Sequence, residues 1–214
     1  MRRWSIWYGL LGALAAAPAA AVTVGQLDDF QDGSVQAWSG GSTPTNIATG
    51  GPSGIGDRYL RISAASGNLG TNNTTQWLGN YSAAGIVKLN IYLNNIGAVP
   101  LALRITVFGP GGNFTTTNET VLPAASGWAS VEFGLGAADL TQTFGGGTLA
   151  QTLADVTILL IRHDPDPISP SGEQNPVTGT LGIDNVIALP EPGSTLLLAT
   201  GLTALALARA RRSR

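Results

Sequence analysis

The clearest signal in the sequence is a pair of alternating segments, IVKLNIYL at residues 86–93 and LALRITVF at residues 101–108. Every second residue from Val87 to Leu93 is apolar, and the same holds from Leu101 to Val107. A period of two predicts β-strands with one buried face. Residues 94–100 between the segments have the composition of a loop, so we expect the two strands to form a hairpin.

Further strand candidates lie on both sides of this pair, at residues 59–63, 114–121, 128–133, 156–162 and 180–189. Glycine- and proline-rich breakers separate them, and only residues 149–154 read as a short helix. Many short strands with little helix predict an all-β fold, a β-sandwich of the jelly-roll type. We assign residues 22–189 to this single domain, which is large enough to bury a core without disulfides.

Composition agrees with this fold class. The 214 residues include 29 glycines and only 11% charged residues, which disfavours a helical bundle because exposed helix faces are normally charged. Cysteine is absent, which excludes disulfides, thiolate metal sites and cysteine nucleophiles. Between residues 22 and 189 there are twelve acidic and five basic residues, a net charge of −7. An acidic domain without a basic stripe is a poor partner for nucleic acid.

The N-terminal 21 residues have the three parts of a secretory signal peptide. Arg2 and Arg3 precede an apolar stretch at residues 6–17, and Ala19 and Ala21 place small residues where signal peptidase needs them. We predict cleavage after Ala21. An uncleaved anchor is the alternative, but the apolar stretch is short for a bilayer core of about 30 Å.

Residues 190–214 form a second three-part segment. Pro190, Glu191 and Pro192 precede an uncharged apolar stretch at residues 193–208, and an arginine cluster follows, with Arg209, Arg211 and Arg212. As a helix the stretch would cover about 24 Å, enough for a transmembrane helix if the arginines snorkel. The arginines predict a cytoplasmic C-terminus and a domain on the outer side of the inner membrane. An ordinary tail anchor is the alternative.

In this order, the three parts resemble the PEP-CTERM sorting signal of Gram-negative bacteria that produce exopolysaccharide. The resemblance implies that exosortase, a membrane-embedded processing enzyme, cuts the membrane-anchored precursor near residues 190–192. It also implies release to the cell surface or extracellular matrix. It implies no activity for the domain.

A second resemblance concerns the domain. Residues 28–33 with Trp38 resemble the opening of exported jelly-roll domains, and residues 182–186 resemble their closing strand. Residues 54–60 and 76–81 are similar to ectodomains of other PEP-CTERM proteins, which are themselves similar to laminin-G-like and carbohydrate-binding modules. The resemblance implies a two-sheet jelly roll whose first and last strands lie together.

Catalysis has little support in the sequence. His163 is the only histidine, and no Gly-x-Ser-x-Gly motif is present. A glycoside hydrolase would need two convergent carboxylates, and spacing alone selects no pair. We therefore expect a non-enzymatic protein without a cofactor.

A structural Ca²⁺ is the one metal for which the sequence offers ligands. Carboxylates are its preferred ligands, and those of Asp28, Asp29, Asp32 and Asp184 come together if the terminal strands pair. The EF-hand pattern is absent.

Sugar binding would use exposed aromatic rings with neighbouring amides. Trp77 and Tyr81, four residues apart among Gln76 and Asn80, form the preferred patch. Trp38, Tyr59, Tyr92 and Trp128 are further candidates. The leading hypothesis is a structural or adhesive protein of an exopolysaccharide or biofilm matrix. The alternative is a glycan-binding module, with extracellular polysaccharide as partner.

Overall fold

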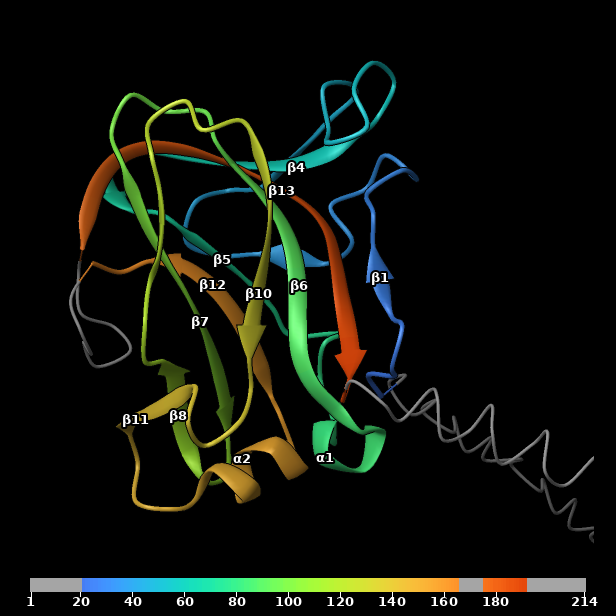
Figure 1. The fold of residues 1–214 in the computed structure, drawn as a ribbon, viewed down its shortest axis with the longest axis vertical. Helices are drawn as coiled ribbons and strands as arrows, with labels where there is room; N and C mark the ends of the chain where they lie inside the picture. The colour runs from blue at the N-terminus through green and yellow to red at the C-terminus, as the bar shows by residue number, and fades with distance from the viewer. Residues whose placement is uncertain (1–20, 166–174, 192–214) are drawn as a thin grey trace, which may run out of the picture.

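The computed structural model describes residues 21–165 and 175–191, which form two antiparallel β-sheets packed face to face (Figure 1). The all-β sandwich predicted from the sequence is confirmed. In the described part of the chain, no helix is long and apolar enough to cross a membrane. The predicted transmembrane helix and nearly all of the predicted signal peptide lie outside the described residues.

One sheet contains both the first and the last strand, and we call it the terminal sheet. Its strands follow the order β10 (Trp128–Gly134), β6 (Ile86–Asn95), β13 (Pro176–Pro190), β4 (Tyr59–Asn68) and β3 (Thr45–Ile47). The short β1 (Leu27–Asp28) pairs with β13, Leu27 lying opposite Ile187. The expectation that the first and last strands lie together is therefore confirmed.

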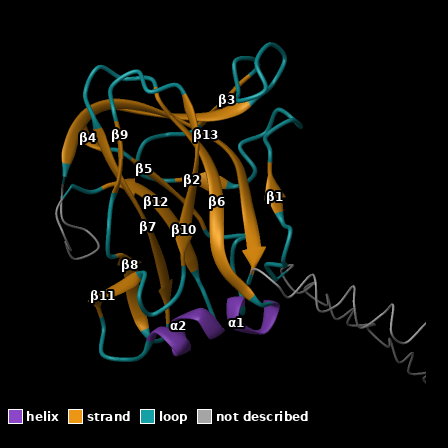
Figure 2. Cartoon of the chain, in the orientation of Figure 1, coloured by secondary structure: helices purple, strands orange, loops and turns teal. Residues whose placement is uncertain are grey.

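The second sheet, which we call the opposite sheet, has seven strands. Its order is β11 (Leu140–Phe144), β8 (Gly112–Thr116), β7 (Leu101–Gly109), β12 (Ile158–His163), β5 (Gly70–Asn73) and β2 (Trp38–Ser39), and β9 (Thr120–Leu122) pairs with β7. Two short helices, α1 (Tyr81–Ala84) and α2 (Leu149–Ala154), lie at one end of the sandwich (Figure 2).

The predicted hairpin of residues 86–108 is wrong, because β6 and β7 belong to different sheets. Both strands form where alternation predicted them, and their apolar faces join one core. The buried Asn95 diverts the chain between them. Its Nδ2 donates to the carbonyl oxygens of Val99 and Pro123, at 2.7 and 2.9 Å, and its Oδ1 accepts from Gly97 N at 3.0 Å. These bonds hold the loop that crosses from one sheet to the other.

The weaker strand candidates are also present, with changed limits. The segment at 114–121 is divided between β8 and β9, and the segment at 180–189 belongs to the longer β13. Residues 149–154 form α2, where Thr148 and Gln151 make a reciprocal capping box. The strands β2, β3, β5 and β11 were not predicted from the sequence.

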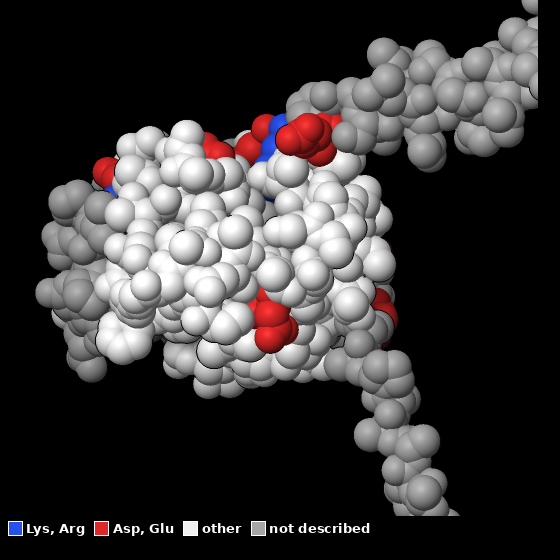
Figure 3. All heavy atoms as spheres, turned by 90° about the horizontal axis from the view of Figure 1, so that it is seen from below, with Lys and Arg blue, Asp and Glu red and all other residues white. Residues whose placement is uncertain are grey.

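The end of the sandwich that carries both helices has few charged side chains on its surface (Figure 3). Asn80 caps α1, since its Oδ1 accepts from Ala83 N at 2.7 Å, and Gly85 ends the helix with a φ of 72°. This end is also where the described chain stops, after β13.

Candidate functional site

The predicted sugar-binding patch is wrong, because its two aromatic rings are buried. Trp77 and Tyr81 each have 0% exposure. The Trp77 indole Nε1 donates to Asp28 Oδ2 at 2.7 Å, and the Tyr81 hydroxyl donates to the Trp77 carbonyl oxygen at 2.9 Å. Gln76 also donates to Asp28 Oδ2, and Asn80 serves as the helix cap. These four side chains therefore stabilise the fold and present no platform for a sugar ring.

Asp28 is the centre of this buried cluster. Its Oδ2 also accepts from the Trp38 indole at 2.7 Å, so one carboxylate oxygen holds two tryptophans. Burial raises the pKa of Asp28, while the hydrogen bonds from Trp77 and Trp38 act in the opposite direction. Of the other aromatic candidates, Tyr59 is buried, whereas Tyr92 and Trp128 are half-buried on the terminal sheet.

The four predicted calcium ligands do not all come together. Asp28 binds the tryptophans, and Asp32 accepts from Ser34 N and Oγ in an exposed turn, which lowers its pKa. The charges of Asp29 and of Asp57 both act on Asp184, and Asp57, 28 residues after Asp29, was not among the predicted ligands. Among the described residues, no group of three or more carboxylates or histidines could by itself hold a metal ion.

Asp184 has the most unusual electrostatic environment of this group. It is fully buried, and Asn185 N donates to its Oδ1 at 2.8 Å. Burial, together with the nearby Asp57 and Asp29 carboxylates, raises its pKa to about 7. A bound cation would reverse this effect, because a positive charge favours the ionised carboxylate.

A different site lies on the outer face of the opposite sheet. A hollow of about 180 Å³, which we call the sheet hollow, opens where β12 meets the turn between β4 and β5. Leu160 and Arg162 point outward there, because the alternate residues Leu159 and Ile161 belong to the core. The polar residues that line the hollow are Asn68, Arg162, His163 and Asn175.

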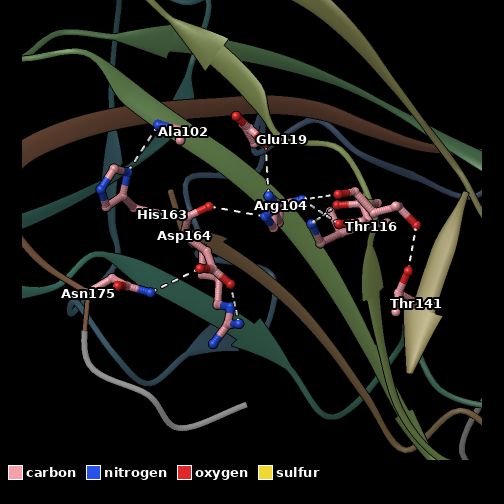
Figure 4. Close-up of polar contacts among 11 residues, drawn as sticks. Ala102, Arg104, Thr116, Glu119, Thr141, His163, Asp164 and Asn175 are labelled. Carbon is pink, nitrogen blue, oxygen red and sulfur yellow. Dashed lines mark hydrogen bonds and ion pairs between the residues drawn. The ribbon is translucent and has the colours of Figure 1, made fainter. Parts of the chain in front are cut away.

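A polar network fixes these side chains (Figure 4). The buried Asp164 carboxylate forms an ion pair with Arg162 and accepts from Asn175 Nδ2 at 2.9 Å. The carbonyl oxygen of Asp164 accepts from Arg104 Nε at 3.1 Å. Arg104 is itself fully buried, and its Nη2 contacts Glu119 at 2.8 Å. The network therefore links the hollow to the middle of the sheet.

His163, at the edge of the hollow, is held as a neutral imidazole. Its Nδ1 accepts from Ala102 N at 3.1 Å, which leaves the ring proton on Nε2. Burial lowers its pKa, with the opposing effect of Asp164 being smaller. The described residues that line the hollow include no carboxylate. The arrangement is suited to donating hydrogen bonds to neutral hydroxyl oxygens and lacks the paired acids of a glycoside hydrolase.

A second hollow, of about 170 Å³, does bring carboxylates together: those of Glu119, Glu132 and Asp139. Glu119 pairs with Arg104 and Glu132 with Lys88, at 2.8 and 2.7 Å. Asp139 Oδ2 accepts from Gly136 N in a turn. These contacts give each carboxylate a structural role.

The predicted processing residues are described only in part. Pro190 is the last residue of β13, opposite Ile86, and Glu191 is exposed immediately after it. Ala21 is exposed and precedes the buried Val22, whose N donates to Leu78 O at 3.0 Å. The remaining predicted residues, Ala19, Pro192, Arg209, Arg211 and Arg212, lie outside the described residues.

Comparison with known proteins gives fold similarity alone. No protein-family model matches the sequence, and no curated protein matches it. The structure is similar to an exo-beta-agarase, with a TM-score of 0.55 and 13% identity over 79% of this chain; the chain spans about a quarter (25%) of that enzyme's length.

Two solved carbohydrate-binding modules match over nearly their whole length. CtCBM11 has a TM-score of 0.54 and 16% identity, over 79% of this chain and 97% of that module. A second match is the family 11 module from Clostridium thermocellum in complex with a beta-1,3-1,4-mixed-linked tetrasaccharide. Its TM-score is 0.50 and its identity 15%, over 80% of this chain and 98% of that module. These similarities support the jelly-roll part of the predicted fold.

Proposed function

We propose that the domain is a non-catalytic module that binds polysaccharide in the sheet hollow. The observation that carries this proposal is a donor-rich hollow, lined by no described carboxylate, on a sandwich that resembles carbohydrate-binding modules over their whole length. The sequence analysis favoured a structural matrix role and kept glycan binding as the alternative. The structure favours the alternative, at a site that the sequence analysis did not identify.

The hollow has the chemistry that a neutral sugar needs. The exposed amide of Asn68 can both donate to and accept from hydroxyl groups, and Arg162, His163 and Asn175 make the rest of the lining polar. Leu160 offers an apolar surface to a ring face. At about 180 Å³ the hollow is smaller than sites for drug-sized ligands. It therefore suits one or two sugar units of a chain that continues into solvent.

Affinity electrophoresis through agarose, xylan and mixed-linkage β-glucan tests this proposal. We expect retardation by at least one of the three, and isothermal titration with its oligosaccharide then gives the Kd. Asn68 is exposed, and its side chain makes no hydrogen bond within the described residues. Asn68→Ala should therefore leave the fold intact and weaken binding about fivefold, the effect of one lost hydrogen bond.

Asn118→Ala is the matched control, since this exposed asparagine lines the second hollow. It should leave the Kd unchanged. Equal losses in both variants would contradict the assignment of the site. No retardation of folded protein by any polysaccharide would instead favour the structural matrix role.

We also propose that the domain reaches its polysaccharide by the predicted export route. Signal peptidase would cut after Ala21, and an exosortase-type enzyme near residues 190–192 would release the domain to the cell surface or extracellular matrix. Two observations support these limits: the buried Val22 begins the packed domain, and β13 ends at Pro190. The intact mass of the extracellular form tests both cuts, and a recovered chain that kept Met1 and Arg214 would contradict them.

A structural Ca²⁺ stays a proposal, with the predicted ligands Asp29 and Asp184. Backbone oxygens would have to complete the ligand set, because no three carboxylates among the described residues could hold the ion. An unchanged melting temperature on exchanging Ca²⁺ for EDTA would contradict it.

A further inference from the structure

The end of the sandwich near Glu191 forms a continuous surface, which we call the floor. It consists of α1, α2 and the loop at residues 144–148 (Figure 2). Gly79 and Val156 exchange two backbone hydrogen bonds of 2.8 Å between the segments that carry the helices. Thr152 Oγ1 donates to Gly112 O at 2.9 Å. The floor is therefore held together as one rigid surface.

The floor differs in charge from the rest of the domain. Its three segments, YSAA, LAQTLA and FGGGT, contain no Lys, Arg, Asp or Glu, although the domain carries a net charge of −7. An exposed carboxylate, Asp155, follows directly at the C-cap of α2, at the edge of the floor. Figure 3 looks onto this end and shows few charged side chains. An uncharged surface can leave water without the large cost of desolvating ions.

Phe144 is the most exposed aromatic residue of the floor, with 67% of its surface accessible. Its backbone is held closely, because a side chain at Gly112 would come within 2.2 Å of the Phe144 carbonyl oxygen. The ring therefore projects into solvent from a fixed strand end. An exposed phenyl ring can enter the boundary between lipid headgroups and acyl chains without any repacking of the domain.

The distance to the predicted anchor is short. β13 holds Pro190 opposite Ile86, at the same end of the molecule as α1 (Figure 1). The uncharged apolar stretch begins at Gly193, so only Glu191 and Pro192 separate it from the strand. Two residues span at most about 7 Å. An anchor at residues 193–208 therefore brings this end of the domain to the membrane surface.

We propose that the floor rests on the lipid bilayer while the precursor is anchored, with the Phe144 ring in the boundary between headgroups and acyl chains. This inference rests on the proposed anchoring by residues 193–208. One phenyl ring binds a membrane too weakly to hold a free domain, but the tether makes the contact intramolecular and raises its effective concentration. The contact presents the exposed Glu191 to a membrane-embedded processing enzyme, and cleavage of the tether then frees the domain.

Site-directed fluorescence on the full chain tests the contact, because the protein has no native cysteine. Ala150→Cys places a nitrobenzoxadiazole probe on α2 within the floor and keeps Phe144. Val121→Cys is the control, an exposed position on β9 near the opposite end of β7. The chain is reconstituted into phosphatidylethanolamine–phosphatidylglycerol vesicles that contain a nitroxide-labelled lipid. We expect quenching at Ala150 to exceed that at Val121 by at least about twofold.

Phe144→Ser in the Ala150→Cys chain should reduce this quenching toward the control value, and undiminished quenching would overturn the role of the ring. A chain that floats with the vesicles but is quenched equally at both probes would overturn the floor contact and leave the anchoring standing. A chain that does not float would overturn the anchoring, and with it this inference. A probe shielded at Ala150 without lipid quenching would indicate a protein partner and would also overturn the proposal.

Discussion

Asp184→Asn should make the protein more stable at neutral pH when calcium is absent. Burial and the Asp57 and Asp29 carboxylates raise the pKa of Asp184 from 3.8 to about 7. A rise of about 3 units corresponds to about 4 kcal/mol, an upper limit because neighbouring groups adjust. The folded state binds the proton more tightly than the unfolded state. Asp184 therefore destabilises the fold progressively as the pH rises from about 4 to about 7.

Urea unfolding of wild type and variant at pH 4, 5, 6 and 7, with EDTA present, measures this effect. Asn keeps an oxygen that can accept from Asn185 N, but it cannot ionise. The difference in free energy of unfolding between the two proteins should shift in favour of the variant across this range, by up to about 4 kcal/mol. Taking the difference cancels the titration of groups that do not interact with Asp184, so the measured shift belongs to Asp184 together with its neighbours Asp57 and Asp29.

Parallel profiles for the two proteins between pH 4 and 7 would refute this reasoning, because Asp184 would then have an ordinary pKa. Added Ca²⁺ provides an independent result. A bound cation favours the charged carboxylate, so it should stabilise the wild type at pH 7 more than the variant. Equal stabilisation of both would contradict the proposed calcium site without affecting the pH argument.

The remaining predictions concern buried polar groups, and chemical denaturation measures each of them. Arg104→Met should lower the free energy of unfolding by about 3–5 kcal/mol, because it leaves Glu119 and several buried carbonyl oxygens without their donor. Lys88→Met, which removes a surface ion pair, should lower it by less than about 1 kcal/mol. Trp77→Phe removes one of the two indole donors to Asp28 and should cost about 1–3 kcal/mol. Asn95→Ala should lower the free energy of unfolding by a similar amount, because it leaves carbonyl oxygens of the loop unpaired. A decrease below about 0.5 kcal/mol would contradict the role of Asn95 in holding the loop.

The sequence predicted which residues form the main strands and which of their faces are buried, because alternation depends only on neighbouring positions. It did not predict the partner of each strand. Alternation at residues 86–93 and 101–108 is the same whether two strands pair side by side or face each other across a core. The structure has the second arrangement, and the buried Asn95 stabilises the connecting loop through its bonds to residues 97, 99 and 123.

The candidate site was harder to predict because it depends on contacts between distant residues. Trp77 and Tyr81 are residue types that sugar-binding platforms use. Their burial depends on contacts with distant residues, such as the Asp28 carboxylate, 49 residues before Trp77, which accepts from the Trp77 indole. The sheet hollow likewise combines Asn68 with residues about 90–110 positions later. One local signal was present: Arg104 interrupts a strand that is otherwise apolar or small, which is a typical sign of a buried polar network.

The position of β13 has a consequence for how the chain is made. This strand lies between β6 and β4 in the terminal sheet, yet it is the last strand of the domain along the chain. Until residues 176–190 have been synthesised, β4 and β6 each lack their central neighbour, and the two halves of that sheet cannot join. The terminal sheet therefore closes last, and the export route that we propose would carry a chain whose sandwich is not yet complete.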